Sequence, residues 1–559
     1  MISALVTRLG PLVLGLVWLC MATTLSAQDT APSIAPSIAP NTAQDAIGAL
    51  RDRFAPACGT PDAADTTGLV ERQVVCDRVL RVGLREDYPR FGAAGADGPE
   101  GYEADIARDI AARLGVDIAF SAVTPVNRIA KLGSGEIDLV IATMGHNTQR
   151  DPTVHFLRPH YFQSETIVVG ASTTGPLAWE NLETRLVCTT VGNYSNVILA
   201  PAVGRLMLFS RPQQLLDALE NEMCPLIAQD DTLLLPLIAP ETGTTRFERK
   251  LGFAPVPWGM AMPLGISPEM SAAMTQILIE MHRDGTFLRL ARDHGLPLTF
   301  LTEERARWGS VECGVTPQDC LAPPLDVQLE PSAVAGIADA IEATLAKAMG
   351  LELRLGFMES AVAWRLFLGG LGTSVLAVIL SVVATILISF AIAGLQVSRF
   401  WPARALAKVL LTIFLNVPVV LVLVIMSTLM IWAFSYSFPV AMASAILAIC
   451  GINGCYAGSA IAEAHAITAA TPTTSRFIQS VGVASVPLKG YIFNSVRGIS
   501  AATVVGVPDL VNALNDITAF SGAQTFYYWL LVIFYVAAVL TTGVVLHRAM
   551  PLFVPGWRA

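Results

Sequence analysis

Charged residues are scarce in this chain of 559 residues. Asp, Glu, Lys and Arg together make up 14% of it, whereas a soluble globular protein carries about 25%. Hydrophobic residues reach 53%, and the mean hydropathy is +0.55. This composition excludes an ordinary cytosolic enzyme and indicates that part of the chain lies in lipid.

Acidic and basic residues are distributed unevenly along the chain. From Leu366 to the C-terminus there are eight bases and three acids, a net charge of +5. The part up to Arg365 holds the remaining 28 bases and 42 acids, a net charge of −14. An acidic, water-facing first half therefore precedes a hydrophobic, slightly basic second half. The sequence has no basic stripe, so nucleic acid is not an expected partner.

Motifs of enzyme chemistry are also missing from the sequence. No GxxxxGK[ST] loop occurs anywhere, so the chain cannot hydrolyse ATP by that route. We find no paired acid and base and no activated nucleophile that would mark a catalytic centre. The sequence therefore predicts no catalytic residues, no metal site and no cofactor.

The N-terminus has the features of a secretory signal peptide. Residues 1–27 contain Arg8, an apolar run from Leu12 to Ala22, and small residues before a presumed cleavage site. An uncleaved membrane anchor is the alternative. Residues 28–78 are expected to form a linker rich in Ala, Pro and Ser, followed by a cysteine-containing N-terminal extension.

Export would place the first half in an oxidising compartment, where disulfides form. Six of its cysteines fall into three local pairs, and free buried thiols are the alternative for each pair. The pairs are Cys58 with Cys76, Cys188 with Cys224, and Cys313 with Cys320. Cys450 and Cys455 lie in an apolar segment and are expected to be buried as small hydrophobic residues.

Residues 79–300 alternate short apolar runs with helical ones. Val79–Leu84 is predicted as a strand, 103–114 as a helix and 116–120 as the next strand. A further helix and strand follow before Ala142. Strands that alternate with helices in this way indicate a parallel sheet with helices on its faces.

Several short motifs in this region resemble the polar amino acid branch of the periplasmic solute-binding proteins. The motifs are 84–91 (LREDYPRF), 101–105 (GYEAD), 127–129 (NRI), 138–161, 191–195 (VGNYS), 228–231 (AQDD) and 256–260 (VPWGM). The resemblance covers residues 79 to 297. It implies an α/β bilobed periplasmic binding domain of type II that closes on an amino acid.

The residues of such a site can be assigned from their chemistry. An amino acid zwitterion that leaves water needs a guanidinium for its carboxylate and a carboxylate for its ammonium group. Arg150 fits the first role, because it is expected to open a helix just after a strand. Asp230 lies at a strand end of the other lobe and fits the second role, with Asp231 as the alternative. Thr143 would add a polar contact, and Tyr88 would pack on the aliphatic part of the ligand.

Two further arginines indicate the charge of the ligand. Arg85 and Arg128 match positions that look like those of the glutamate- and aspartate-binding proteins, which need an additional cation for the side-chain carboxylate. Three arginines around one cleft disfavour a neutral or basic ligand, so the resemblance implies glutamate or aspartate. A solvated surface charge is the alternative for each arginine. His146 is expected to point to solvent or to cap the turn, with no role in the site.

The second half is expected to be an all-α transmembrane bundle. Residues 301–366 form a connector, and 367–559 contain five apolar stretches long enough to cross about 30 Å of hydrocarbon. These stretches are 367–394, 408–434, 437–460, 481–507 and 525–546. With the first half exported, the basic residues beside these stretches fall on the cytoplasmic side, as the positive-inside rule requires. Asp509 and Asp516 fall outside.

Motifs at 367–374, 416–418 and 485–510 are similar to the permease subunits of polar amino acid ABC transporters. The resemblance implies a multi-pass protein of the bacterial inner membrane, in contact with lipid and with its N-terminal half in the periplasm. It also implies a homo- or hetero-dimer of permease domains and a separate cytosolic ATPase subunit. The loop 461–476 departs from the family pattern, because it keeps Glu463 but is too short for the helix that docks on the ATPase.

The combined pattern predicts the substrate-binding and permease component of an ABC-type amino acid uptake system, with acidic amino acids as the expected ligands. Covalent fusion would raise the effective concentration of the binding domain at the membrane to about millimolar. A ligand sensor, in which closure of the binding domain moves the helices without transport, is the alternative that the short loop favours. An enzyme on the same two-lobed scaffold is a weaker third hypothesis, because a fold alone assigns no function.

Overall fold

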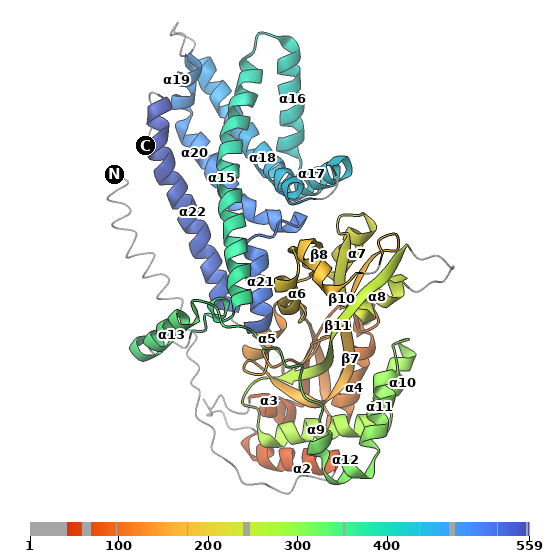
Figure 1. Cartoon of the computed structure of the whole chain (residues 1–559). Helices are drawn as coiled ribbons and strands as arrows, with labels where there is room; N and C mark the ends of the chain where they lie inside the picture. The colour runs from red at the N-terminus through yellow and green to blue at the C-terminus, as the bar shows by residue number, and fades with distance from the viewer. Residues whose placement is uncertain are drawn as a thin grey trace.

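The computed structural model describes residues 42–557 apart from 59–68, 97, 176, 239–245, 350–352, 435–436, 469–475, 522–523 and 555–556. The predicted signal peptide 1–27 and the first part of the predicted linker lie outside the described residues. Figure 1 shows a mixed α/β region in its lower half and a set of long helices in its upper half. The chain passes from the first region to the second through a connector that carries α13 (Ala335–Met349).

The first lobe is built on three parallel strands. Its elements are β1 (Val79–Leu84), β2 (Asp87–Tyr88), β3 (Gly92–Gly95), β4 (Gly98–Glu100), α4 (Tyr102–Leu114), β5 (Asp117–Ala122), α5 (Arg128–Gly133) and β6 (Leu139–Ile141). β1 lies between β5 and β6 and pairs in parallel with both. Leu80, Val82 and Leu84, which point to the same face of β1, are completely buried, as expected for the side of a strand that faces the core. The helix predicted over 103–114 is α4, which ends at Gly115 in the left-handed conformation that favours glycine.

The second lobe repeats this arrangement. Its elements are η3 (Trp179–Thr184), β8 (Leu186–Thr190), α6 (Asn196–Ala202), β9 (Arg205–Phe209), α7 (Pro212–Glu220), β10 (Leu226–Asp230) and α8 (Asp231–Ile238). Here β8 is the central strand, and it pairs in parallel with β9 and β10. Each lobe therefore places its first strand between its second and third strands, as expected for two related folding units.

Two long strands join the lobes. β7 (His155–Ala171) and β11 (Phe247–Met262) pair with each other and link both parallel sets into one eight-stranded sheet, in the order β5-β1-β6-β11-β7-β10-β8-β9. The pairing is interrupted at three places on β11, one of them between Phe253 and Val256. Ala254 lies in this interruption and has a φ of 50°, which is unusual for a residue other than glycine. Both connections between the lobes are therefore irregular, because β11 carries an extra residue near Ala254 and β7 carries extra residues between Leu157 and Phe162.

Helices before β1 and after β11 complete the core of the first lobe. They are α2 (Ala43–Phe54), η1 (Ala55–Ala57), α3 (Leu69–Arg72), η2 (Gln73–Asp77), α9 (Pro268–Arg283), α10 (Thr286–Asp293), α11 (Thr299–Trp308), α12 (Val311–Val315) and η4 (Pro317–Cys320). Ile47 and Leu50 of α2 are buried in the same hydrophobic cluster as Ile277 of α9. The backbone N–H of Ala43 also donates to Glu280 Oε1 over 2.8 Å. The part of the N-terminal extension from Thr42 onward is therefore not a linker, because α2 packs into the domain.

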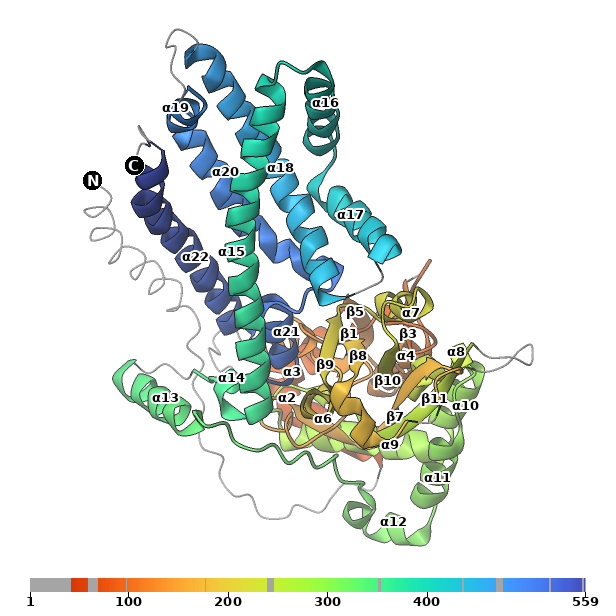
Figure 2. The ribbon, with the colours of Figure 1, turned by 45° about the horizontal axis from the view of Figure 1, so that its top comes forward.

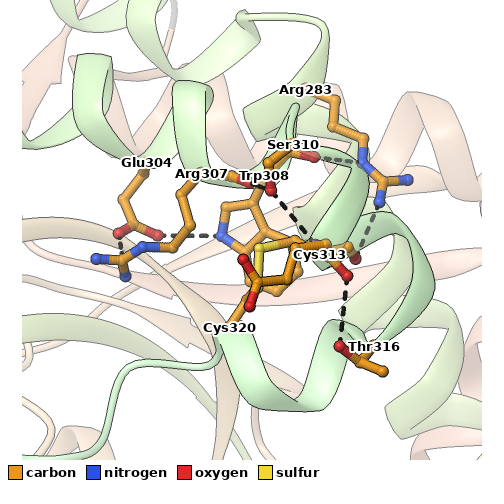
Figure 3. Close-up of a disulfide and its surroundings, with 9 residues drawn as sticks. Arg283, Glu304, Arg307, Trp308, Ser310, Cys313, Thr316 and Cys320 are labelled. Atoms are coloured by element: carbon orange, nitrogen blue, oxygen red, sulfur yellow. Dashed lines mark hydrogen bonds and ion pairs between the residues drawn. A yellow bond between two sulfur atoms is a disulfide. The ribbon is translucent and has the colours of Figure 1, made fainter.

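The three predicted cysteine pairs form disulfides in the structure: Cys58–Cys76, Cys188–Cys224 and Cys313–Cys320. The last pair closes a short turn after α11 (Figure 3). Arg283 of α9 donates from Nε to the carbonyl of Trp308 over 2.8 Å, and the Trp308 indole donates to Glu304 Oε2 over 3.0 Å. These contacts and the disulfide hold the C-terminal cover of the domain against α9.

The C-terminal half is entirely helical where the structure describes it. Its elements are α14 (Gly356–Glu359), α15 (Ala361–Val397), α16 (Trp401–Asn416), α17 (Val419–Phe434), α18 (Phe438–Ile467), α19 (Arg476–Val483), α20 (Ser485–Gly498), η6 (Ile499–Val505), α21 (Leu510–Ser521) and α22 (Gln524–Phe553). By length and composition, α15, α18 and α22 could each cross a membrane. The pair α16 and α17 would make a fourth span if the two count as one, although they meet at 118°.

The predicted fourth span, 481–507, is not one long helix. It is divided between the end of α19, the 14 residues of α20 and the 3-10 helix η6, which ends at Gly506 in the left-handed conformation. The predicted second span, 408–434, is likewise divided at Val417 between α16 and α17. The structure therefore does not have one continuous helix for each of the five predicted spans. The number of membrane crossings stays a prediction.

Small residues form the contact between α15 and α18. A Cβ atom built on Gly458 would lie 2.8 Å from Ile392 Cβ and 2.8 Å from the Ser389 carbonyl, so only glycine permits this close approach. Such contacts are typical of helices that pack in lipid. Cys450 and Cys455 are buried free thiols in α18, as predicted.

Candidate functional site

The carboxyl ends of the parallel strands in both lobes face one another across a small cavity. Ligands of open α/β sheets bind at this edge. Five of the six residues predicted to bind the ligand line the cavity: Arg85, Arg128, Thr143, Arg150 and Asp230. The sixth, Tyr88, lies next to it and donates a hydrogen bond to Asp230 Oδ2 over 3.2 Å. The structure therefore brings the predicted residues together, while their role in ligand binding stays a prediction.

Arg85 follows β1 and is held in place by two neighbours. Its Nε donates to Asp87 Oδ1 over 2.8 Å and its Nη1 to Thr143 Oγ1 over 3.1 Å. The guanidinium also lies 4.9 Å from the centre of the Tyr88 ring, a cation–π contact. Arg85 is 4% exposed, so it is not the solvated surface charge considered as the alternative. Thr143, with a φ of 45°, is in turn fixed by a hydrogen bond from its N–H to Glu103 Oε1 over 2.6 Å.

Arg128 is the first residue of α5 and is only 2% exposed. Its Nη1 donates to the Ala142 carbonyl over 2.6 Å, but its Nε has no hydrogen-bond partner. No ion pair joins Arg128 to a carboxylate within the part of the chain that the structure describes. Burial and the positive charges of Arg150 and Arg85 lower its pKa well below the usual value. The cleft thus holds a buried cation whose charge the protein does not match closely.

Arg150 lies in a turn after Asn147, not at the start of a helix as the sequence analysis expected. Its side chain is fully buried and bridges the two lobes. Nη1 donates to the Gly145 carbonyl of the first lobe over 2.8 Å, and Nη2 donates to the Gly192 carbonyl of the second lobe over 3.2 Å. Burial lowers its pKa to about 10, against the favourable charges of Asp516 and Asp230.

Asp230 ends β10 on the opposite wall of the cavity. Its Oδ2 accepts from the Tyr88 hydroxyl, and its Oδ1 is buried without a hydrogen-bond partner. Burial, and then the neighbouring charge of Asp231, raise its pKa to about 7. The alternative residue, Asp231, accepts instead from the hydroxyl of Ser164 over 2.5 Å, away from the cavity lining. The geometry therefore favours Asp230 as the acceptor for an ammonium group.

The lobes are closed on this cavity, whose volume is about 10 Å³. That is the space of roughly one water molecule, whereas sites for small organic ligands have about 300 Å³ or more. An amino acid can reach the arginines only if the lobes move apart. The strands β7 and β11, whose pairing is interrupted at three places, are the connections within the sheet about which they can do so.

Several residues of the cavity were not among the predicted site residues. In the second lobe, the Asn193 amide donates to Gln229 Oε1 and the Gln229 amide to Thr190 Oγ1. Behind the cavity lining of the first lobe, Glu103 lies at the start of α4, and burial raises its pKa although Tyr161 and the Thr143 N–H bond to it. The amides lie within the quoted motifs 191–195 and 228–231. Glu103 is a less obvious candidate because a first-turn acid usually favours the helix dipole.

His146 was expected to point to solvent or to cap the turn, but the structure buries it. It is 3% exposed, and its Nδ1 lies 2.8 Å from His160 Nε2 while its Nε2 lies 2.8 Å from Asp151 Oδ1. Its ring also stacks on Phe156, with 4.0 Å between the ring centres. Burial, helped by the charge of Arg158, lowers the pKa of His146 to about 3. The neutral imidazole therefore supports the wall of the first lobe behind Gly145.

Comparison with known proteins matches the two-lobed domain. Residues 80–296 match the family model of the bacterial extracellular solute-binding proteins, family 3. This domain has the type II periplasmic binding fold, as predicted, and a helical region with several apolar helices follows it. A search of curated proteins found no match.

Three solved structures illustrate the likeness. The P235GK mutant of ArgBP from T. maritima is 19% identical, with a TM-score of 0.37, over 41% of this chain and 99% of that chain. The solute receptor for L-cysteine of Neisseria gonorrhoeae is 23% identical, with a TM-score of 0.36, over 40% and 92%. An ancestral arginine-binding protein bound to glutamine is 24% identical, with a TM-score of 0.35, over 39% and 97%.

Proposed function

We propose that the two-lobed domain binds an acidic amino acid, glutamate or aspartate, between its lobes. The observation that carries this proposal is the buried guanidinium of Arg128, which no carboxylate pairs among the described residues. Arg150 and Asp230 would bind the carboxylate and ammonium groups shared by all amino acids. A second carboxylate on the ligand would then match the charge of Arg128, which a neutral ligand would leave buried and uncompensated.

The charge of the whole cleft supports the same ligand class. Arg85 is already paired with Asp87, so its charge is largely balanced within the protein. The remaining cations of the cavity, Arg128 and Arg150, face the carboxylates of Asp230 and Glu103, whose pKa values burial raises. An arginine or lysine ligand would instead bring a further cation beside Arg128, which has no ion pair among the described residues, and a cleft of low dielectric disfavours that arrangement.

The apolar composition of the helical half supports a membrane location for this protein. We propose that the chain is a multi-pass protein of the bacterial inner membrane, with the two-lobed domain in the periplasm and the helices acting as a permease. A cytosolic ATPase subunit and a second permease domain would be its partners. The apolar helices α15, α18 and α22 and the small-residue contact between two of them support a membrane role.

Calorimetric titration of the intact chain in detergent with a panel of amino acids tests the ligand. We expect glutamate or aspartate to bind most tightly. Arg128→Met should weaken glutamate binding at least tenfold and glutamine binding much less, since only glutamate has the second carboxylate. Arg289→Met, which changes an exposed arginine, is the matched control. Tighter binding of lysine or leucine than of glutamate by the wild-type chain would contradict the proposal.

A ligand sensor is the second candidate function, and the loop between α18 and α19 favours it. Helix α18 continues to Ile467, and Arg476 Nη2 of α19 donates to the His465 carbonyl over 2.8 Å, so the two helix ends lie together. Residues 469–475 lie outside the described part. Reconstituted vesicles with the candidate ATPase decide between the two functions. ATP-dependent glutamate uptake with this as the only permease chain would support transport, and ligand binding without uptake would support a sensor.

A further inference from the structure

Helix α21 of the C-terminal half lies between the long helices and the two-lobed domain (Figures 1 and 2). Its Asp516 Oδ1 accepts from the backbone N–H of Gly192 over 2.9 Å and from Asn196 Nδ2 over 2.8 Å. Both donors belong to the second lobe. The carboxylate of Asp516 therefore ties the helical half to the segment that also lines the candidate ligand cavity.

This contact is made where both lobes meet. A Cβ atom on Gly192, whose φ is 76°, would lie 2.6 Å from Pro125 of the first lobe and 2.9 Å from Ala519 of α21. Gly192 is thus enclosed by three segments that are distant in sequence. The close fit shows that α21 docks on the closed form of the domain at the rim of its cleft.

Asp516 also belongs to the charge system of the cleft. It is completely buried, and its Oδ2 has no hydrogen-bond partner in the described part of the chain. Arg150 Nη2 donates to the Gly192 carbonyl while Asp516 Oδ1 accepts from the Gly192 N–H, so both side chains bond to the backbone of one residue, and the charge of Asp516 favours the protonated form of Arg150. The candidate carboxylate-binding arginine thus already faces a carboxylate that the other half of the chain supplies.

A ligand carboxylate at Arg150 would approach this same charge. Two carboxylates beside one guanidinium in a buried site repel each other. Each carboxylate therefore reduces the favourable free energy with which the other binds there. The effect must be mutual, because an interaction that weakens ligand binding when α21 is docked also weakens docking when the ligand is bound.

We propose that Asp516 is an affinity-determining residue of the ligand site, contributed by the C-terminal half, and that its carboxylate competes with the ligand carboxylate for Arg150. This inference rests on the proposed function, in which Arg150 binds the ligand carboxylate. The intact chain then binds an anionic ligand less tightly when α21 is docked than when it is released.

The first test is titration of the intact chain in detergent with L-glutamate. Asp516→Asn keeps the shape of the side chain and an oxygen acceptor but removes the charge. It should tighten glutamate binding by about fivefold or more. Asp293→Asn removes one charge from an exposed carboxylate and should leave the affinity unchanged. Unchanged or weaker binding by Asp516→Asn would overturn the proposal.

A second test needs no ligand. Val197 and Ile517 line one cavity of about 230 Å³ between the second lobe and α21, so cysteines at both positions, joined by a short bifunctional thiol reagent, report docking. Arg150→Met should slow the cross-linking severalfold, because Asp516 loses its charge partner, and Arg150→Lys should restore it. Equal rates for all three chains would overturn the inference. Absence of amino acid binding with these rate changes would instead refute only the proposed function.

Discussion

The two-lobed domain and the helical half bury polar side chains of different kinds. The cleft of the domain buries arginines and carboxylates from several different elements, and Arg128 Nε and Asp230 Oδ1 have no hydrogen-bond partner among the described residues. The helical half buries mainly hydroxyls, which bond locally: Thr385 Oγ1 donates to the Ser381 carbonyl one turn away, and it lies 2.7 Å from Ser495 Oγ on α20. The hydroxyls on the helices find hydrogen-bond partners within the helical half, whereas the charged groups of the cleft can still bind a ligand.

The largest expected effect is on ligand binding in the domain. Arg150→Ala removes the guanidinium that bridges the lobes and should weaken glutamate binding by about 2–5 kcal/mol, since a buried charge pair loses one partner. Titration calorimetry of the intact chain measures it, with Arg289→Ala as the surface control. If Arg150→Ala binds glutamate like the wild type, the ligand carboxylate is bound elsewhere.

Removal of a disulfide from the two-lobed domain should lower stability more than removal of a free thiol from the helical half. Changing both Cys188 and Cys224 to Ser should lower the free energy of unfolding of the domain by about 2–5 kcal/mol, because the cross-link and its buried packing are lost. Cys450→Ala, at a buried free thiol of α18, should cost roughly 1 kcal/mol. Thermal unfolding in detergent, followed separately for each half, measures both. A larger loss for Cys450→Ala would reverse the comparison.

Glycines in the helical half should show where its packing is tight. Gly458→Ala puts a methyl group against Ile392 and the Ser389 carbonyl, so we expect a loss of about 1–3 kcal/mol. Gly394→Ala in α15 is the matched control, because nothing lies within 4 Å of its added Cβ. It should instead stabilise the helix by up to about 1 kcal/mol. Equal thermal midpoints for the two variants would show that α15 and α18 do not pack as described.

The smallest expected effect is the pH dependence of binding. Because the pKa of Asp230 is raised to about 7, the carboxyl takes up a proton as the pH falls through this value and can no longer pair with an ammonium group. Glutamate affinity should therefore fall about fourfold between about pH 8 and pH 6.5, and the slope approaches tenfold per pH unit only at lower pH. The stability of the unliganded chain should change in the opposite direction, since a raised carboxyl pKa stabilises the fold at low pH.

Titration at several pH values checks this dependence. Asp230→Asn should flatten the profile as well as weaken binding. Asp516, whose pKa is raised to about 6 by burial, titrates mostly below the chosen range and so contributes little there. A flat wild-type profile would mean that Asp230 is ionised throughout or does not touch the ligand.

The sequence predicted the first lobe well because local pattern determines it. The alternation of β1 and α4 and the glycine after α4 can be read from neighbouring residues. Helix α2 was missed because its small apolar face has meaning only against α9, more than 200 residues away. The site residues that follow strands were found for the same local reason, whereas Asp516 meets Gly192 across 324 residues and has no local signal.

The helical half was harder to predict for a different reason. Its segments are apolar on all sides, so hydrophobicity locates them but does not show where a helix breaks. The division of 481–507 at Gly498 and Gly506 depends on how α20 and η6 pack against neighbouring helices. No change in polarity marks that division in the sequence.

The interruption of β11 at Ala254 has a mechanical consequence. A strand pair in continuous register resists bending, whereas an extra residue on one strand lets the pair fold at that point. We expect Ala254 to act as a hinge about which the two lobes rotate. The Tyr194 hydroxyl, from the cavity wall, donates to the Ala254 carbonyl over 2.9 Å. A ligand that displaces Tyr194 would therefore also change how easily the two strands bend at Ala254.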